Sequence, residues 1–433
     1  MRVVIVGAGV LGLTLGYELA RQGAEVELLD ARESGLGASS VNAGWVVPSE
    51  AAPVPGPGLI AKSLKWMVRS DSPLYIKPSV DPSHVRFMLG MWRRCNARDF
   101  RAGFQAHLTL AESTNDILDD YARDGIDFDS YAQGLLMAFR DRGNLEHHCH
   151  DLDIQASFGL DPQVLEGDAI QQAEPAMRSG LAGGIFFPHE RHVDCVTLTA
   201  GLRKRIVELG GTITENTPVE RVERIGDTVV AVRGGDRRFA ADAFVVAAGP
   251  WTGRVSGLFG VPLPVRPGKG YSIDLAPEPM HLRTAINLSD AKVAMTPYAG
   301  RVRLSGTMEF AGLDEKVNHA RVAAVLRAPA GYVDGWVTPA SAPQARAGMR
   351  PMTPDGMPII GRLPGADNAY VSSGHGMLGV TLGPGTSYAL AKVILGQGRR
   401  DPGRGQQRRL LPFSPERFVR KVRRTPALTP AAR

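Results

Sequence analysis

The first thirty residues constrain the fold more than any other segment. Residues 2–6 are apolar and predict a buried β-strand, which runs directly into Gly7, Gly9 and Gly12 at the start of a predicted helix. Gly7 permits a tight turn, Gly9 lets the backbone approach a pyrophosphate, and Gly12 lets the helix pack closely on the strand. Free N–H groups at such a helix start, with the positive end of the helix dipole, bind phosphate. The segment therefore predicts a Rossmann-like unit that holds a dinucleotide.

An acidic residue follows at the spacing that this unit needs. Residues 24–29 predict the second strand, and Asp30 stands at its end. A carboxylate there can accept hydrogen bonds from a ribose diol, and it repels a 2′-phosphate. An ordinary strand–turn–helix unit without a ligand is the alternative. We favour the dinucleotide because strand, helix and acid all occupy the positions that the motif requires.

Composition limits the class of protein. With 433 residues and 43% hydrophobic content, the chain can build two or three domains with large cores. Cys95, Cys149 and Cys195 lie far apart and form no CxxC pair, which argues against disulfides or a zinc site and fits a reducing compartment. The histidine-rich run at residues 146–150 predicts an exposed polar face rather than a metal site. No apolar run reaches the roughly 18–20 residues of a membrane span, so a cytoplasmic protein is expected.

The net charge of +6 is concentrated at the C-terminus. From Arg399 to the end, eleven Lys and Arg residues stand against two Asp and Glu, so the rest of the chain is slightly acidic. A solvated terminus is the simplest interpretation. The alternative is a peripheral contact with anionic lipid at the inner face of the cell membrane, or with an acidic partner. Nucleic-acid binding is not expected, because no aromatic residues interleave with a basic groove elsewhere.

The order of predicted elements indicates an α/β protein with a discontinuous Rossmann-like domain and an α+β substrate domain that contains an antiparallel sheet. The dinucleotide-binding domain is expected from residues 1–60, 192–255 and 345–415. The substrate domain is expected from residues 61–191 and 256–344, and a basic tail from residues 416–433. Helical periodicity is predicted within residues 59–123. Asp194 is expected to cap a helix.

A second glycine-rich turn lies near the C-terminus. Residues 369–373 predict a strand, and the segment from Gly374 to Thr381 leads from it into a helix. Backbone N–H groups converge at such a turn, where they would stabilise the negative charge that a reduced flavin ring develops. Tight packing alone is the alternative role for these glycines.

Arg350 is the candidate for substrate binding. It lies between Gly348 and Pro351. An arginine at the surface without a function is not expected in such a motif. Its planar guanidinium suits bidentate binding of a carboxylate. An internal ion pair with Asp355 is the alternative.

Taken together, these motifs resemble the D-amino acid dehydrogenase family, a branch of the FAD-dependent amine oxidoreductases that includes glycine oxidase and sarcosine oxidase. The resemblance covers nearly the whole chain up to about residue 415. It rests on the N-terminal glycines, the segments 39–44 and 247–251, the Arg350 motif and the segment 374–379.

The resemblance implies FAD as the cofactor. Its ADP half would lie on the N-terminal glycine loop and Asp30, the flavin ring on the loop at residues 39–44, and the pyrimidine edge on the C-terminal motif. The implied cofactor-binding residues are Gly7, Gly9, Val10, Leu11, Gly12, Asp30, Ala31, Arg32, Ser39, Ser40, Asn42, Ala43, Gly44, Val219, Ala248, Gly249, Trp251, Gly376, Met377, Leu378, Gly379, Val380 and Thr381. Non-covalent FAD is expected, because Asn42 stands where covalent relatives have histidine and no cysteine lies near the C-terminal motif.

The resemblance also implies a substrate pocket. Arg350 would bind the substrate carboxylate, with Tyr271 as a second contact. Trp45, Met308 and His375 would lie on the pocket wall, where His375 could instead only shape its turn. Two departures from the family pattern stand out. Arg346 replaces a frequent tryptophan near the pocket mouth, and an aromatic contact of glycine oxidase is missing at residues 292–294. Asp290 and Lys292 are expected at the surface.

The implied reaction is the FAD-dependent oxidative deamination of a small amino acid, with a D-amino acid as the favoured substrate. Hydride would leave Cα for flavin N5, and water would convert the imino acid into a 2-oxo acid and ammonia. The alternatives are a glycine-, sarcosine- or D-hydroxyproline-type oxidase or dehydrogenase, and a partner-dependent flavoprotein subunit. A flavin monooxygenase is disfavoured, because Gly374-His375 replaces its Gly-Asp motif. The electron acceptor, quinone or oxygen, is left open.

Overall fold

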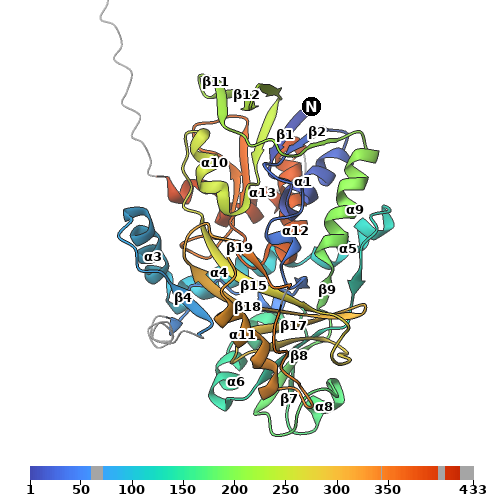
Figure 1. Ribbon diagram of the computed structural model, residues 1–433. Coiled ribbons are helices and arrows are strands. Elements are labelled where there is room, and N and C mark those ends of the chain that lie inside the picture. The colour runs from blue at the N-terminus through green and yellow to red at the C-terminus, as the bar shows by residue number, and fades with distance from the viewer. Residues whose placement is uncertain (60–71, 343, 398–404, 420–433) are drawn as a thin grey trace, which may run out of the picture.

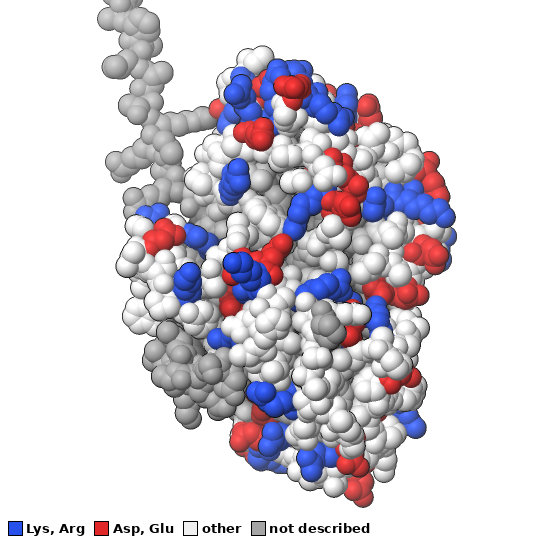
Figure 2. Space-filling model, in the orientation of Figure 1, with Lys and Arg blue, Asp and Glu red and all other residues white. Residues whose placement is uncertain are grey.

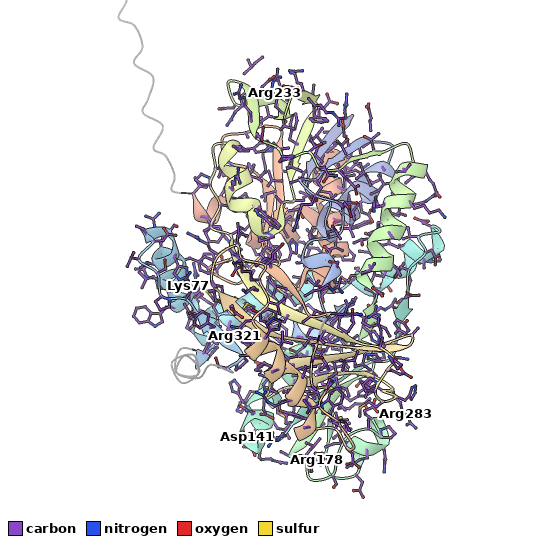
Figure 3. All side chains as sticks on the ribbon, in the orientation of Figure 1. Lys77, Asp141, Arg178, Arg233, Arg283 and Arg321 are labelled. Atoms are coloured by element: carbon purple, nitrogen blue, oxygen red, sulfur yellow. The ribbon has the colours of Figure 1, made fainter. Side chains whose placement is uncertain are left out.

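The computed structural model describes residues 1–59, 72–342, 344–397 and 405–419, and has two halves that meet along a central cavity. In Figure 1 a parallel sheet with α1, α9, α10 and α12 forms the upper half, and β15, β17 and β18 with α11 belong to the lower half. On the face shown in Figure 2, Lys and Arg are interspersed with Asp and Glu. In Figure 3, Arg233 marks the top of the upper half, and Asp141, Arg178 and Arg283 mark the bottom of the lower half.

The upper half is built on a six-stranded sheet with the order β10-β2-β1-β14-β21-β20. Neighbouring strands are parallel except for β20 and β21. The strands are β1 (Arg2–Val6), β2 (Glu25–Leu29), β10 (Thr212–Thr214), β14 (Ala243–Val246), β20 (Ile359–Arg362) and β21 (Ala369–Ser373). Apolar side chains alternate between two cores: Val3 and Ile5 face one side of the sheet, and Val4 faces the other. Both faces are therefore covered, as parallel sheets require.

The helices α1, α9 and α12 pack on the face that Val3 and Ile5 share, where Gly383 of α12 lies next to Leu11 of α1. The opposite face is covered by α10 and a three-stranded antiparallel sheet. These elements are α1 (Val10–Ala20), α9 (Cys195–Glu208), α10 (Thr252–Leu258), α12 (Gly379–Ile394), β11 (Arg221–Ile225), β12 (Thr228–Gly234) and β13 (Arg237–Ala240). As expected, Asp194 caps α9, and its carboxylate accepts a hydrogen bond from the N–H of Val196 at 2.9 Å.

The lower half is built on a nine-stranded mixed sheet with the order β19-β15-β18-β17-β16-β6-β8-β7, and β4 pairs with one end of β18. Its strands are β4 (Leu74–Ile76), β6 (Leu135–Phe139), β7 (Gln163–Leu165), β8 (Gly183–Phe187), β15 (Arg266–Leu275), β16 (Ala285–Leu288), β17 (Val293–Tyr298), β18 (Arg301–Phe310) and β19 (Arg346–Met352). One face packs an apolar core that includes residues of α11 (His319–Arg327), and the other face lines the cavity.

The remaining helices flank these sheets, and a small sheet joins the two halves. The helices are α3 (Pro82–Arg94), α4 (Ala97–Ala111), α5 (Thr114–Arg123), α6 (Arg142–Cys149), α7 (Leu152–Ser157), α8 (Ala169–Ala173) and α13 (Gly405–Leu410). The small sheet contains β3 (Trp45–Val46), β5 (Ser130–Tyr131) and β9 (Arg191–Val193). None of the helices in the described part of the chain is both long and apolar enough to cross a membrane.

The predicted fold class is confirmed, with two differences at its boundaries. Residues 346–352 form β19 of the large sheet, so the substrate half extends past the predicted boundary at residue 344. The predicted tail begins inside ordered structure, because Arg417 binds the carboxylate of Asp355 at 2.8 Å. Helices α3, α4 and α5 match the helical periodicity expected within residues 59–123, while residues 60–71 lie outside the described residues.

Candidate active site

A cavity of about 1020 Å³ lies between the two sheets. The upper half contributes the carboxyl ends of β1, β2 and β14 and the start of α12, and the lower half contributes the open face of the large sheet. In open α/β sheets, ligands bind outside the carboxyl ends of the strands. The cavity is lined by Asp30 of the upper half and by Arg350 and Lys292 of the lower half. It therefore spans both the predicted cofactor site and the predicted substrate site.

The N-terminal loop can only be built with glycines. The backbone of Gly7 has φ +112°, and a Cβ there would overlap with the carbonyl oxygen of Ala247. A Cβ on Gly12 would overlap with the carbonyl oxygen of Gly7, so α1 packs directly on the turn. Ser39 Oγ accepts a hydrogen bond from the N–H of Val10 at 2.9 Å. The loop is thus held in place while the start of α1 faces the cavity, as anion binding requires.

Asp30 has a structural role in addition to the predicted ribose contact. Its carboxylate accepts hydrogen bonds from the N–H groups of Ala8 at 2.7 Å and Arg32 at 2.9 Å. A carboxylate has about four lone-pair sites, so acceptor capacity remains for a ligand hydroxyl. The Arg32 guanidinium stacks over the ring of Trp251 at 4.7 Å, and both residues line the cavity.

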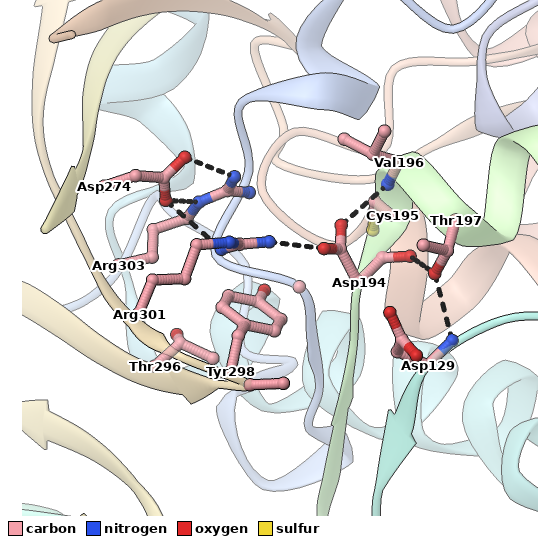
Figure 4. Close-up of polar contacts among 12 residues, drawn as sticks. Asp129, Asp194, Cys195, Val196, Thr197, Asp274, Thr296, Tyr298, Arg301 and Arg303 are labelled. Atoms are coloured by element: carbon pink, nitrogen blue, oxygen red, sulfur yellow. Dashed lines mark hydrogen bonds and ion pairs between the residues drawn. The ribbon is translucent and has the colours of Figure 1, made fainter. Parts of the chain in front are cut away.

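The loop predicted to lie under a flavin ring is bound from below by a polar network (Figure 4). Arg303 donates to the carbonyl oxygen of Asn42 at 3.0 Å and binds both oxygens of Asp274 at 2.7 and 2.9 Å. Arg301 links Asp274 to Asp194 at the start of α9. Burial by itself raises the pKa of Asp274, but the hydrogen bond from Arg303 and the surrounding arginine charges bring its pKa below the ordinary value. The network therefore joins the loop, the large sheet and α9.

The residues of this network were not identified from the sequence. Arg303 is 1% exposed, and Tyr298 beside it donates to the carbonyl oxygen of Ala43 at 3.0 Å. The available signal was the arginine pair at 301 and 303 on an otherwise apolar strand. Such cations are rarely buried unless they are paired.

Helix α12 begins at the opposite wall of the cavity. Gly379 at its start lies against Leu11, where a Cβ would come within 3.3 Å of a leucine methyl. Thr381 Oγ1 accepts from the N–H of Val47 and donates to the carbonyl oxygen of Trp45, both at 3.1 Å. Gly9 and Leu378, which precede α1 and α12, provide no side-chain cap, and Ser39 binds the first N–H of α1. The next N–H groups at each helix start are oriented for a ligand in the cavity.

Arg350 lies in the cavity on the large sheet. Its Nη1 donates to the carbonyl oxygen of Thr307 at 2.7 Å, and Gly270 provides the space, because a Cβ there would overlap with the guanidinium. Burial lowers the pKa of Arg350 to about 10. The alternative pair with Asp355 is wrong, since that carboxylate binds Arg417. Among the described residues no carboxylate pairs with Arg350, so its charge is balanced only when an anion binds.

Most of the predicted site residues line the cavity, and three do not. Gly12, Ser40 and Tyr271 are not part of the cavity wall. The Ser40 hydroxyl donates to the carbonyl oxygens of Leu36 and Gly37 at 3.2 Å. The predicted residues that line the cavity are Gly7, Gly9, Val10, Leu11, Asp30, Ala31, Arg32, Ser39, Asn42, Ala43, Gly44, Trp45, Val219, Ala248, Gly249, Trp251, Met308, Arg350, His375, Gly376, Met377, Leu378, Gly379, Val380 and Thr381.

The prediction that Tyr271 contacts the substrate is not compatible with its position. Its ring belongs to the apolar core on the far face of the sheet, and its hydroxyl donates to Glu309 at 2.6 Å. Gly270 faces the cavity instead. The bulge in the pairing of β15 with β18 has its extra residue on β18, between Gly306 and Glu309. β15 therefore keeps a regular alternation, in which Tyr271 faces away from the cavity.

The three residues predicted on the pocket wall differ in how their side chains are held in place. His375 Nε2 lies 3.0 Å from Thr386 Oγ1, and burial lowers the pKa of His375 to about 3, so the ring is neutral and shapes the turn before α12. Trp45 Nε1 donates to Thr296 Oγ1 at 2.9 Å, which fixes the indole beside β17. The Met308 sulfur lies 3.9 Å from Arg350 Nη1.

Two charged residues relate to the cavity in different ways. Lys292 is exposed, as expected, and it also lines the cavity from the turn between β16 and β17, where it has φ +55°. Arg346, expected near the pocket mouth, is not part of the cavity wall and pairs with Asp274 at 3.2 Å. Glu50 also lines the cavity, and the sequence pattern did not single it out. Asp290 binds the N–H of Arg140 at 2.7 Å.

These residues fit FAD as the bound group. The glycine loop leaves room for a pyrophosphate, Asp30 and the start of α1 face the first half of the cavity, and α12 faces the second. Among the described residues, no group of three or more His, Cys, Asp or Glu side chains is arranged to hold a metal ion. The fold and cavity define a dinucleotide-dependent oxidoreductase in which Arg350 lies on the cavity wall.

Comparison with known proteins assigns the family. A family model described as FAD dependent oxidoreductase, abbreviated DAO, matches residues 2–393, and the chain belongs to this family. The cofactor is therefore FAD.

Curated relatives and a solved structure agree with this assignment. The chain is 35% identical over 404 residues to a D-amino acid dehydrogenase of Cereibacter sphaeroides, with 92% of both chains covered. It is 34% identical to a D-amino acid dehydrogenase of Bradyrhizobium diazoefficiens, covering 92% of this chain and 96% of that one. The structure of glycine oxidase from Geobacillus kaustophilus has the same fold, with a TM-score of 0.74, 23% identity, and 97% and 100% of the two chains covered.

Proposed function

We propose that this protein catalyses the FAD-dependent oxidative deamination of a small D-amino acid to a 2-oxo acid and ammonia. Arg350 carries the proposal, because it is a half-buried cation on the cavity wall, and no carboxylate of the described residues pairs with it. The D-amino acid dehydrogenases named above support the choice of substrate, since they match this chain over nearly its full length.

The residues of the chain position the substrate rather than react with it. Arg350 binds the substrate carboxylate through the guanidinium nitrogens that Thr307 does not use. Gly270 leaves the space that the Arg350 guanidinium occupies, and Gly348 leaves room for Val41 to approach the sheet. When bound, FAD supplies the acceptor for the hydride that leaves Cα. The resulting imino acid is hydrolysed by water to the 2-oxo acid and ammonia.

The reductive half-reaction tests the proposal directly. Purified protein with bound FAD is mixed anaerobically with D- and L-amino acids, glycine, sarcosine and 4-hydroxy-D-proline, and the oxidised-flavin absorbance is followed. Bleaching by D-amino acids alone supports the proposal. Bleaching by glycine or sarcosine alone would replace it with the amine-oxidase alternative. No bleaching by any of these compounds would leave the partner-dependent subunit.

We further propose that a membrane-bound quinone accepts the electrons and that the basic C-terminus contacts anionic lipid at the inner face of the membrane. The support is the charge of the sequence from Arg399 onward. Sedimentation with anionic liposomes at low salt, compared for the full chain and a chain that ends at residue 419, tests the contact. Equal recovery of both proteins in the supernatant would contradict it, and comparing reoxidation by oxygen with that by a quinone analogue tests the acceptor.

A further inference from the structure

Three polar residues line the cavity across the sheet from Arg350. Asn287 lies on β16, Lys292 follows the turn into β17, and Glu50 ends a short helical turn, Pro48–Glu50, in the loop opposite. Asn287 pairs in register with Ala294, and Ala294 pairs with Ser305. All three of these strand residues line the cavity, so Asn287 shares the open face of the sheet with Arg350.

Glu50 is held by a packed backbone. Its N–H donates to the carbonyl oxygen of Val47 at 3.1 Å. The preceding residue, Ser49, donates its N–H to Glu190 at 2.9 Å and accepts from Gln155 at 2.8 Å. Because these partners are buried, the backbone that carries Glu50 is fixed before any ligand binds, which restricts where its carboxyl can lie.

Glu50 is influenced by both of the other residues. Burial raises the pKa of Glu50, while the charge of Lys292 and a hydrogen bond from Asn287 act in the opposite direction. A carboxyl group, an amide and an ammonium group thus line the same part of the cavity. Polar groups that lose water when a ligand binds cost free energy unless the ligand replaces those hydrogen bonds.

The position of this group matches the far end of a bound amino acid. Arg350 reaches β18 through its hydrogen bond to Thr307, and Asn287 lies two strands further along the sheet, about 10 Å away at the usual strand spacing. Another part of the cavity wall, formed by Met88, Met91 and Phe310, is apolar and offers no hydrogen bond to a polar side chain of the substrate.

We propose that Glu50, Asn287 and Lys292 form a polar subsite that makes the enzyme selective for an amino acid with a hydroxyl group on its side chain. A hydroxyl donates one hydrogen bond, to Glu50, and accepts from the amide or the ammonium group. A cationic side chain would meet Lys292, and an anionic one would meet Glu50. This inference rests on the proposed function and names the substrate class of the same site.

Pairs of substrates that differ in a side-chain hydroxyl group test the subsite. The pairs are D-serine with D-alanine, D-threonine with D-valine, and 4-hydroxy-D-proline with D-proline, each compared by kcat/KM for flavin reduction. A site built to bind a hydroxyl strongly rejects the analogue without one, so we expect the hydroxylated member to be preferred by at least about 10-fold in one or more pairs. Equal or reversed preference in all three pairs would overturn the inference and leave the proposed function intact.

Variants and a binding measurement separate the subsite from the chemistry. In Glu50→Leu and Asn287→Leu the preference should fall towards 1, whereas Glu50→Gln should keep part of it. Glu166→Gln, at an exposed carboxylate paired with Arg142, is the matched control and should keep the full preference. Perturbation of the flavin spectrum gives the Kd of 3-hydroxypropanoate and propanoate, which cannot be deaminated. If no amino acid reduces the flavin, the proposed function fails, and this pair still tests the subsite: equal Kd values would overturn it.

Discussion

The two halves of the cavity are built on different principles. In the dinucleotide half the ligand surface is backbone, and its shape depends on the absence of side chains at Gly7, Gly9 and Gly12. In the substrate half the surface is made of side chains that reach inward from different strands, with Arg350 at one end and Glu50 at the other. Substitution of these glycines is therefore expected to disrupt the dinucleotide half. Substitution of side chains in the substrate half can change substrate specificity and leave the fold intact.

The largest effect is expected from a methyl group in the glycine loop. In Gly12→Ala the new Cβ would overlap with the carbonyl oxygen of Gly7, so α1 must move away from the turn. Overpacking of this kind costs about 1–3 kcal/mol of folding free energy, and we expect most of the FAD to be lost. Thermal unfolding and the ratio of flavin to protein absorbance measure both effects.

The matched control is Gly257→Ala in α10, where the nearest atom would be 4.0 Å from the new methyl group. Alanine is favoured over glycine in a helix by about 0.5–1 kcal/mol, so this variant should be as stable as the parent or more so and keep its FAD. If both variants behaved alike, the distinction between the two halves would lose its physical basis.

The substrate half should respond at Arg350 without loss of cofactor. Arg350→Lys keeps the charge but removes the planar fork, and hydrogen bonds to charged groups contribute about 1.5–3 kcal/mol, so kcat/KM should fall by about 10–100-fold. The flavin spectrum should stay unchanged. The control residue Arg346 lies four residues before Arg350 on the same strand and pairs with Asp274. Arg346→Lys should change kcat/KM less than about 2-fold, as expected for an exposed ion pair. Similar losses in both variants would argue against Arg350 as the carboxylate-binding residue.

Acid should weaken the dinucleotide half through its buried histidine. Burial lowers the pKa of His375 to about 3, whereas in the unfolded chain the ring titrates near its ordinary value of about 6.5. Between these values the unfolded chain binds a proton that the folded chain excludes, so stability falls as the pH drops from about 6.5 towards 3. Melting temperatures of the protein and of His375→Gln over this range measure the contribution. The variant should show a shallower decline, and an identical decline would exclude His375 as a source.

The smallest effect is expected at Tyr271. Removing its hydroxyl in Tyr271→Phe breaks the hydrogen bond to Glu309 on the far side of the sheet, at a cost of about 1 kcal/mol of stability. Because the ring lies outside the cavity, kcat/KM should stay within about 2-fold of the parent. A large loss of activity with unchanged stability would restore Tyr271 as a substrate contact.

The sequence alone determined the dinucleotide half. The roles of Gly7, Gly12 and the Asp194 cap follow from local constraints, in which a positive φ, a close backbone approach or a helix start leaves few residue types. Such constraints act over a few residues and can be read directly from the order of amino acids.

Only the tertiary structure decided the substrate half. Glu50 and Asn287 line the same cavity although 237 positions separate them in the chain, and the register of β15 places Gly270 rather than Tyr271 on that cavity. The counterions of Arg346 and Asp355 likewise came from distant segments. Pairing across strands and the side of a sheet that a residue faces depend on register and bulges, and one sequence does not specify them.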